Sequence, residues 1–295
     1  MPPASGRLEG ALYGSVRAAQ VGGRILPSFH EGIDIAPIHR NSSGRPLDQV
    51  YAVADGTVAF VNRVAGSSNY GIYVVILHAD PAGKIYTLYS HLARVSPGLQ
   101  AGGEVSRGEP IGVMGSTSSP PIPRVRSHLH FEIGMIKNQH FPRWYRARRL
   151  QPDYGLYHGW NLAGIDPLEV YRADPVSPRF SMLDYLRSAP VAFEIVIPSP
   201  RQLDYFQRYP LLWEGERFRP GSIVLAVSEE GVPLRGRNAS PAEEEALGDR
   251  KAVVLKVDEE VLGRNGRRLI VRRRGEWELG RNGQRWLEIF LAPGG

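Results

Sequence analysis

The sequence predicts a mainly β protein with two domains, and three observations support this. Short runs of β-branched and aromatic residues recur along the 295 residues, separated by turn-forming pairs such as Asp55-Gly56 and Pro97-Gly98. Gly and Pro occur 33 and 24 times, which favours a turn-rich architecture over a helical one. The composition of residues 173–178 is typical of a linker. We therefore expect one domain at residues 1–178 and a second at 179–295.

The first domain is expected to be an antiparallel β-sheet domain. Its predicted strands lie at residues 50–54, 56–62, 72–78, 85–91, 110–114 and 127–135, and one short helical turn is expected at 166–171.

The second domain is expected to be β-sandwich-like. Its predicted strands lie at residues 191–198, 221–228, 251–258, 268–273 and 285–292, after a brief helix at 181–188. The pair Asn282-Gly283 precedes the last of these runs and predicts a two-residue hairpin. The acidic run at residues 243–245 is expected to be an exposed loop or a short solvated helix.

The bulk composition excludes several classes of protein. The chain has no cysteine, which rules out disulfide frameworks and thiolate metal sites. It has no apolar run of transmembrane length and no visible signal peptide. The net charge is +6, with 32 Arg and 4 Lys, but 36 cations against 30 anions is a modest imbalance. We interpret this as an ordinary arginine-rich surface, and we expect no nucleic-acid partner.

Three short motifs carry the candidate chemistry. In a strand, His128 and His130 project to the same side, because side chains two residues apart share a face. His30 and Asp34 are separated by Glu31-Gly32-Ile33, where the glycine permits a backbone turn. A buried carboxylate at Asp34, between Ile33 and Ile35, would need a positive partner such as a metal ion. His91 ends a third apolar run. Two His and one Asp would meet the ligand count of a catalytic zinc.

In this order, the motifs resemble the lysostaphin/LytM-type zinc metallopeptidases, which cut peptide bonds in bacterial peptidoglycan. The family's H-x-x-x-D matches His30 and Asp34, its H-x-H matches His128 and His130, and an intervening histidine matches His91. The resemblance covers residues 10–172, with further similar segments at 13–17, 54–58, 69–71, 103–108 and 111–117.

The resemblance implies an antiparallel β-sheet metallopeptidase domain with Zn²⁺ as its cofactor. It implies that His30, Asp34 and His130 bind the metal and that His91 and His128 are catalytic. The other histidines, at positions 39, 78, 140 and 158, are expected to be surface or structural residues, and so are Glu31 and Glu132.

The chain departs from the family pattern at two places. Residues 118–127 form a longer, proline-containing loop, and the residues between Met135 and Asp166 replace a tight hairpin. Both segments approach or leave the H-x-H strand, so we expect them to border the cleft. The arginine-rich stretch at 143–149 is interpreted as a solvated face, and the alternative is that it attracts carboxylates of peptidoglycan.

The sequence therefore predicts a zinc-dependent endopeptidase acting on peptidoglycan cross-links or stem peptides. Glycine bridges and D-alanyl cross-links both remain open as substrates. The alternative is a non-catalytic or latent envelope module that binds peptidoglycan or regulates another cell-wall hydrolase. Either function implies an extracytoplasmic location, with the signal peptide absent from this sequence.

Overall fold

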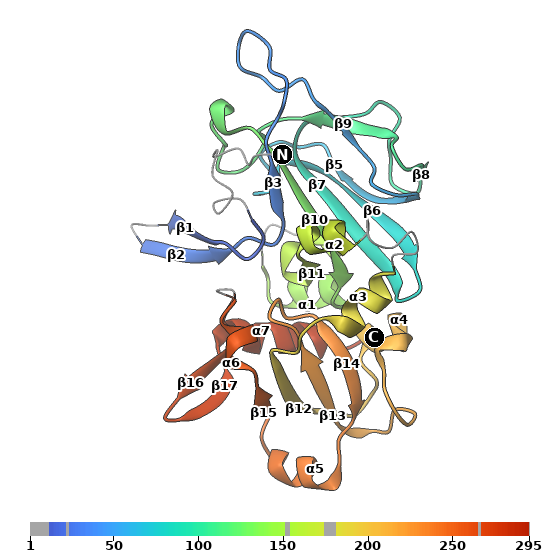
Figure 1. Cartoon of the computed structure of the whole chain (residues 1–295), viewed down its shortest axis with the longest axis vertical. Coiled ribbons are helices and arrows are strands. Elements are labelled where there is room, and N and C mark those ends of the chain that lie inside the picture. The colour runs from blue at the N-terminus through green and yellow to red at the C-terminus, as the bar shows by residue number, and fades with distance from the viewer. Residues whose placement is uncertain (1–11, 22–23, 151–153, 174–180, 265–266, 295) are drawn as a thin grey trace. The chain divides into compact units, whose positions relative to one another are not determined.

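The structure is a computed structural model that describes residues 12–21, 24–150, 154–173, 181–264 and 267–294 (Figure 1). It divides into two compact units. The first unit comprises residues 1–79, 84–134 and 164–171, and the second comprises 80–83, 135–163 and 172–295. A compact unit is not by itself a domain that folds alone, so the expected division at residue 178 stays a prediction. Most of the predicted linker lies outside the described residues.

The first unit is built on a nine-stranded antiparallel sheet, and a separate two-stranded ribbon precedes this sheet in the sequence. The ribbon consists of β1 (Val16–Val21) and β2 (Arg24–Phe29). The strands of the sheet are β3 (Ile33–Ile35), β4 (Gln49–Tyr51), β5 (Gly56–Asn62), β6 (Ile72–Asp80), β7 (Gly83–Val95), β8 (Glu104–Val105), β9 (Pro110–Met114), β10 (Leu129–Ile136) and β11 (Leu162–Ile165). Two short helical segments accompany them, η2 (Arg124–Arg126) and α2 (Pro167–Ala173).

All six strands predicted for this part of the chain are present, so the prediction of a mainly β, antiparallel fold is confirmed. The main path of the sheet runs β11-β10-β7-β6-β5-β8. The central strands are buried on both faces, with Val74, Val75 and Ile76 of β6 and Leu88 of β7 fully inaccessible to solvent. A strand that is buried on both faces has a nearly continuous apolar sequence, and this pattern allowed these strands to be predicted.

Strand β10 positions the predicted site through its register. It pairs antiparallel with β3 on one side and with β7 on the other, so that His130 lies opposite Asp34 and opposite Ser90. Directly opposed residues on antiparallel strands have their Cβ atoms about 4.5–5.5 Å apart and on the same face. Strand pairing alone therefore brings two residues that are 96 positions apart to one point.

The second unit contains a four-stranded antiparallel sheet, a hairpin and several helices. The sheet has the order β14-β13-β12-β15, and its strands are β12 (Phe193–Ser199), β13 (Gly221–Val227), β14 (Pro233–Asn238) and β15 (Val253–Val257). The hairpin consists of β16 (Ile270–Arg273) and β17 (Glu276–Leu279). The helical segments are α1 (Phe141–Ala147), η3 (Gly155–Tyr157), η4 (Gly159–Asn161), α3 (Met182–Ser188), α4 (Asp204–Arg208), η6 (Pro210–Leu212), α5 (Pro241–Leu247), α6 (Glu259–Leu262) and α7 (Arg281–Phe290).

The hairpin predicted at Asn282-Gly283 and the strand predicted at 285–292 are wrong, because this segment forms helix α7. Its buried residues include Trp286, Leu287, Ile289 and Phe290, a spacing that places them along one face of a helix. An Asn-Gly pair signals a hairpin only between two alternating runs, and the second run here has a helical period.

The insertion after β10 packs with the last helix of the second unit. Phe141, Trp144 and Tyr145 of α1 form a buried apolar cluster with Ile289 and Ala292. Beside this cluster, the side-chain amide of the fully buried Asn138 donates to the carbonyl oxygens of residues 289, 290 and 292. Asn138 thus adds hydrogen bonds to carbonyl groups at the end of α7, where helical partners run out. No helix among the described residues is long and apolar enough to cross a membrane.

We predict that Asn138→Ala lowers the free energy of unfolding by roughly 3 kcal/mol, since it removes side-chain hydrogen bonds from buried carbonyl groups at the end of α7. Urea denaturation followed by tryptophan fluorescence measures this change. The control is Gln139→Ala at the exposed neighbouring position, where we expect a change within about 0.5 kcal/mol. Equal stability of the two variants would contradict the role assigned to Asn138.

Candidate metal centre

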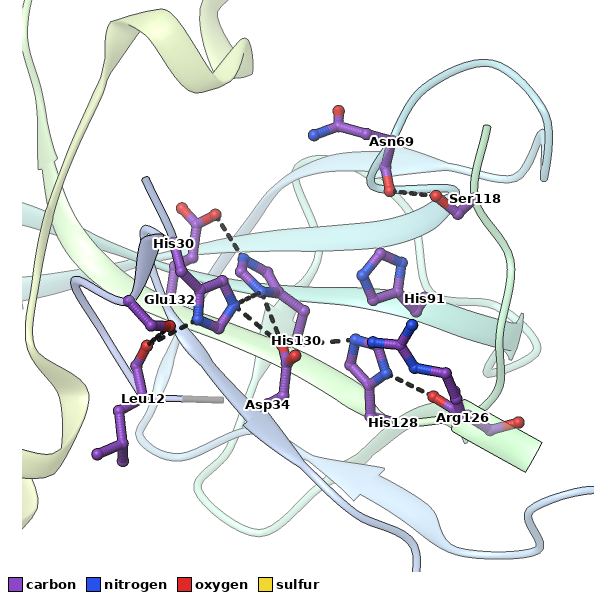
Figure 2. A network of polar contacts seen from close by, with 12 residues as sticks. Leu12, His30, Asp34, Asn69, His91, Ser118, Arg126, His128, His130 and Glu132 are labelled. Atoms are coloured by element: carbon purple, nitrogen blue, oxygen red, sulfur yellow. Dashed lines mark hydrogen bonds and ion pairs between the residues drawn. The ribbon is translucent and has the colours of Figure 1, made fainter. Parts of the chain in front are cut away.

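The structure brings the three predicted metal ligands together in the first unit (Figure 2). His30 directly follows β2, Asp34 lies in β3 and His130 lies in β10. The Nε2 atom of His30 lies 3.0 Å from Oδ1 of Asp34 and 2.9 Å from Nδ1 of His130. Nδ1 of His130 lies 3.2 Å from the same Asp34 oxygen. All three side chains are buried.

This arrangement fits a tetrahedral zinc ion. Bonds of about 2.0–2.1 Å at tetrahedral angles separate neighbouring ligand atoms by roughly 3.3 Å. The three distances in the structure, 2.9, 3.0 and 3.2 Å, are close to that separation. Two imidazole nitrogens and a carboxylate oxygen are a donor set that zinc accepts, and three protein ligands leave a fourth position for water or substrate.

Gly32 is required at this point for a reason other than the expected backbone turn. A side chain at this position would run into the carbonyl oxygen of Phe131, and it would also crowd Glu132 and His130. The glycine therefore allows the segment between His30 and Asp34 to lie directly against β10. This close approach holds the two ligands near His130.

The outer ring nitrogens of the two histidine ligands are fixed by hydrogen bonds. Nδ1 of His30 lies 2.9 Å from the carbonyl oxygen of Leu12, and Nε2 of His130 lies 2.9 Å from Oε1 of Glu132. Because a carbonyl oxygen can only accept, Nδ1 of His30 is the protonated nitrogen, and its Nε2 is left as a lone-pair donor for a metal. Partners of this kind orient metal-binding histidines.

Glu132 is the functional residue that the sequence analysis undervalued. Its side chain is fully buried, and it accepts hydrogen bonds from the hydroxyl groups of Tyr70 at 2.7 Å and Tyr86 at 3.1 Å as well as contacting His130. Burial, together with the charge of Glu132, raises the pKa of both tyrosines well above the usual value, so they remain donors. The signal available in the sequence was parity: residues 128, 130 and 132 share one face of β10.

The negative charge of Asp34 and the positive charge of His130 stabilise each other. Burial opposes ionisation of Asp34, but its hydrogen bonds with His130 and His30 outweigh burial and hold its pKa far below the usual range. Burial also disfavours the charged form of His130. However, its contacts with the carboxyl groups of Asp34 and Glu132 raise its pKa to about 9. Without metal, the centre therefore holds a proton where a metal ion would place its own positive charge.

The two predicted catalytic histidines lie next to the ligands. The rings of His91 and His128 are 4.8 Å apart, and the ring of His91 is 5.8 Å from that of His130. Nδ1 of His91 donates to the carbonyl oxygen of Thr117 at 2.9 Å, and Nδ1 of His128 donates to that of Arg126 at 2.7 Å. Nε2 of His128 lies 3.4 Å from Asp34. Burial and the neighbouring histidines lower the pKa of His91 to about 3, so its imidazole is neutral.

An irregular backbone places His91 in the centre. His91 has a φ of +61°, a conformation that is uncommon for a residue with a side chain and that tends to persist at functional sites. The carbonyl group that accepts from the His91 ring belongs to Thr117. The hydroxyl group of Thr117 in turn accepts from the amide of Ile72 and donates to the carbonyl of Leu92. Gly71, with a φ of +62°, leaves room for the Thr117 carbonyl. No periodicity in the sequence predicts this backbone conformation.

The remaining predicted residues lie elsewhere. His39 is exposed near Asp48, and the buried His78 contacts the carbonyl of Asp55 and the hydroxyl of Thr87, so its role is structural. His140 and His158 belong to the second unit, where His158 packs among aromatic rings. The arginines of residues 143–149 are exposed, consistent with a solvated face. Whether the insertion borders the cleft remains a prediction.

The geometry of this centre suits a metal ion, and part of the chain is similar to known peptidases. Residues 28–142 match peptidase family M23. A stretch of 104 residues is 42% identical to the DD-carboxypeptidase/endopeptidase Mpg of Neisseria meningitidis serogroup B and, equally, to Mpg of Neisseria gonorrhoeae. This stretch is 35% of the chain and 20% of either relative, so the chain spans about a fifth of the length of the curated relatives that it matches.

Solved structures are also similar to part of the chain. A zinc-containing peptidase from Vibrio cholerae is 30% identical, with 42% of this chain and 32% of that chain covered and a TM-score of 0.29. The catalytic domain of lysostaphin from Staphylococcus simulans is 22% identical, with 42% of this chain and 76% of that chain covered and a TM-score of 0.28.

We predict that Glu132→Gln weakens zinc binding by about 10- to 100-fold, because the variant loses the carboxylate that orients His130 and increases its basicity. Competition with a chromophoric chelator measures the zinc affinity. The control is Glu104→Gln, the same change at an exposed residue of β8. Unchanged affinity in the Glu132 variant would show that His130 does not depend on this contact.

Zinc affinity is also predicted to depend on pH. A proton must leave His130 before Nδ1 can bind metal, so the apparent affinity should rise by about tenfold per pH unit between pH 7 and 9 and then level off. Chelator competition at a series of pH values tests this. In Glu132→Gln the zinc affinity should level off at a lower pH, because the carboxylate that helps to raise the pKa of His130 is gone. A flat profile over this range in the wild-type protein would contradict the raised pKa.

Proposed function

We propose that this protein is a zinc-dependent endopeptidase that hydrolyses peptide bonds in the cross-links or stem peptides of bacterial peptidoglycan. The observation that carries the proposal is a buried group of four imidazoles around one carboxylate, in an M23 peptidase domain. The name of the Neisseria relatives, DD-carboxypeptidase/endopeptidase, supports the substrate class. Such a substrate implies that the protein acts outside the cytoplasm.

In the proposed mechanism, His30, Asp34 and His130 hold the zinc ion. When bound, zinc would polarise the scissile carbonyl and lower the pKa of a water molecule. Glu132 and the Leu12 carbonyl orient the two histidine ligands through their outer nitrogens.

His91 and His128 are proposed to move protons and to stabilise developing charge. Each uses Nδ1 to donate to a backbone carbonyl, so Nε2 is the ring nitrogen that would take part in the reaction. A neutral imidazole can accept a proton from the attacking water and later donate one to the leaving amine. Once protonated, it can also donate a hydrogen bond to the oxyanion that forms at the scissile carbonyl.

The alternative, a non-catalytic envelope module, has no specific observation in its favour. A module that only binds peptidoglycan would not need two further imidazoles beside the ligand set. The arrangement of His91 and His128 next to three potential ligands therefore supports hydrolysis over binding alone.

We predict that the zinc-loaded protein releases soluble fragments from purified sacculi and that mass spectrometry identifies one cleaved peptide bond. Removing zinc with a chelator should abolish release, and adding zinc back should restore it. Binding to sacculi without fragment release, in zinc-loaded protein, would favour the non-catalytic module.

Two variants are predicted to separate metal binding from turnover. His130→Ala should lose both zinc and activity, because it removes a ligand. His128→Ala should retain zinc but lower kcat by about 10²- to 10⁴-fold, the contribution typical of a general acid or base. Zinc content by atomic absorption and turnover on a stem peptide measure the two effects. Stoichiometric zinc in the His130 variant would contradict the ligand assignment.

A further inference from the structure

Two loops beside His128 are fastened to each other by arginine side chains. We call residues 36–48 the first loop and residues 118–127 the second loop. The guanidinium group of Arg40 donates to Gly44 of its own loop at 2.7 Å. It also donates to three carbonyl groups of the second loop, those of residues 124, 125 and 127, at 3.1, 3.4 and 3.3 Å. In the opposite direction, the guanidinium group of Arg124 in the second loop donates to the carbonyl of Ser43 in the first loop at 3.1 Å.

These bonds fix the turn that leads into β10. The turn is η2, and its last residue, Arg126, supplies the carbonyl that accepts from Nδ1 of His128. The side chain of Arg126 is exposed, and in Figure 2 it runs back toward His128 rather than away from it. The backbone that carries Arg126 is therefore fixed beside His128, and the exposed guanidinium group of Arg126 extends from this point.

No negative charge in the two loops neutralises this group. Residues 118–131 contain no Asp or Glu, and the first loop contains only Asp48. The carboxylate of Asp48 accepts from the backbone amides of Ile38 and His39. Among the described residues, no acidic side chain lies within ion-pair distance of Arg126.

We propose that Arg126 binds a carboxylate group of the substrate, and that the enzyme therefore prefers stem peptides with a free carboxylate near the scissile bond over neutral glycine bridges. This inference rests on the proposed peptidase function. Guanidinium groups suit this task because they remain charged and can donate two parallel hydrogen bonds to one carboxylate. The backbone bonds of Arg40 hold the turn, so little additional ordering of the backbone is needed when substrate binds.

The test uses three versions of one stem peptide in kcat/KM measurements on zinc-loaded protein. The first peptide has all carboxylates free, the second has a C-terminal carboxamide, and the third has amidated side-chain carboxyl groups. We expect one of the two amidated peptides to be cleaved about fivefold less efficiently by the wild type. The peptide that is affected identifies which carboxylate Arg126 binds.

Arg126→Gln should abolish this discrimination by slowing cleavage of the free peptide while leaving cleavage of the sensitive amide unchanged. The matched control is Arg45→Gln, which removes the same charge from an exposed position of the first loop and should keep the discrimination. Arg40→Lys keeps the charge but cannot make the same set of backbone bonds, so we expect it to reduce the discrimination. Unaltered discrimination in Arg126→Gln overturns the inference.

A binding measurement separates failure of this inference from failure of the proposed function. In His91→Ala, which is expected to be inactive, calorimetry should show the same preference for the carboxylate peptide, and the added Arg126→Gln change should remove it. If the wild type cleaves neither sacculi nor any of the peptides, the proposed function fails. If it cleaves all three peptides equally well, only the carboxylate inference fails.

Discussion

The centre depends on one buried carboxylate, that of Asp34, in contact with several imidazole nitrogens. An ionised carboxylate removed from water is costly unless positive charge compensates it. Here His30 and His130 lie about one hydrogen-bond length from the same oxygen, and His128 lies slightly farther away. The group is therefore stable with a proton on His130 or with a metal ion, and proton and metal compete for the same position.

The rest of the first unit supports this arrangement. The register of β10 sets Asp34 opposite His130, and the absence of a side chain at Gly32 allows close approach to β10. Glu132, which contacts His130, accepts hydrogen bonds from two tyrosine hydroxyl groups. Because all of these partners are buried, they have few alternative positions, so the ligands are oriented before a metal binds.

The second unit shows how the additional residues of this chain are accommodated. The insertion after β10 buries its aromatic side chains against the end of α7, and Asn138 satisfies the backbone there. These contacts join the insertion to the C-terminal residues within one compact unit. An isolated fragment ending at residue 178 would lack Ile289 and Ala292 and would expose the apolar face of α1. The insertion and α7 are therefore expected to depend on each other for stability.

The sequence by itself determined six strands of the first unit's sheet and the five side chains gathered at the centre, because apolar runs, turn residues and motif order are local properties. Tertiary structure alone decided the importance of Glu132, whose role depends on two tyrosines far from it in the sequence, and the position of His91, which depends on a positive backbone φ. It also decided that residues 281–290 form a helix, since burial of Trp286 and Phe290 on one face outweighs the local turn preference of Asn282-Gly283. Contacts between distant residues settle such features, and a linear pattern does not encode them locally.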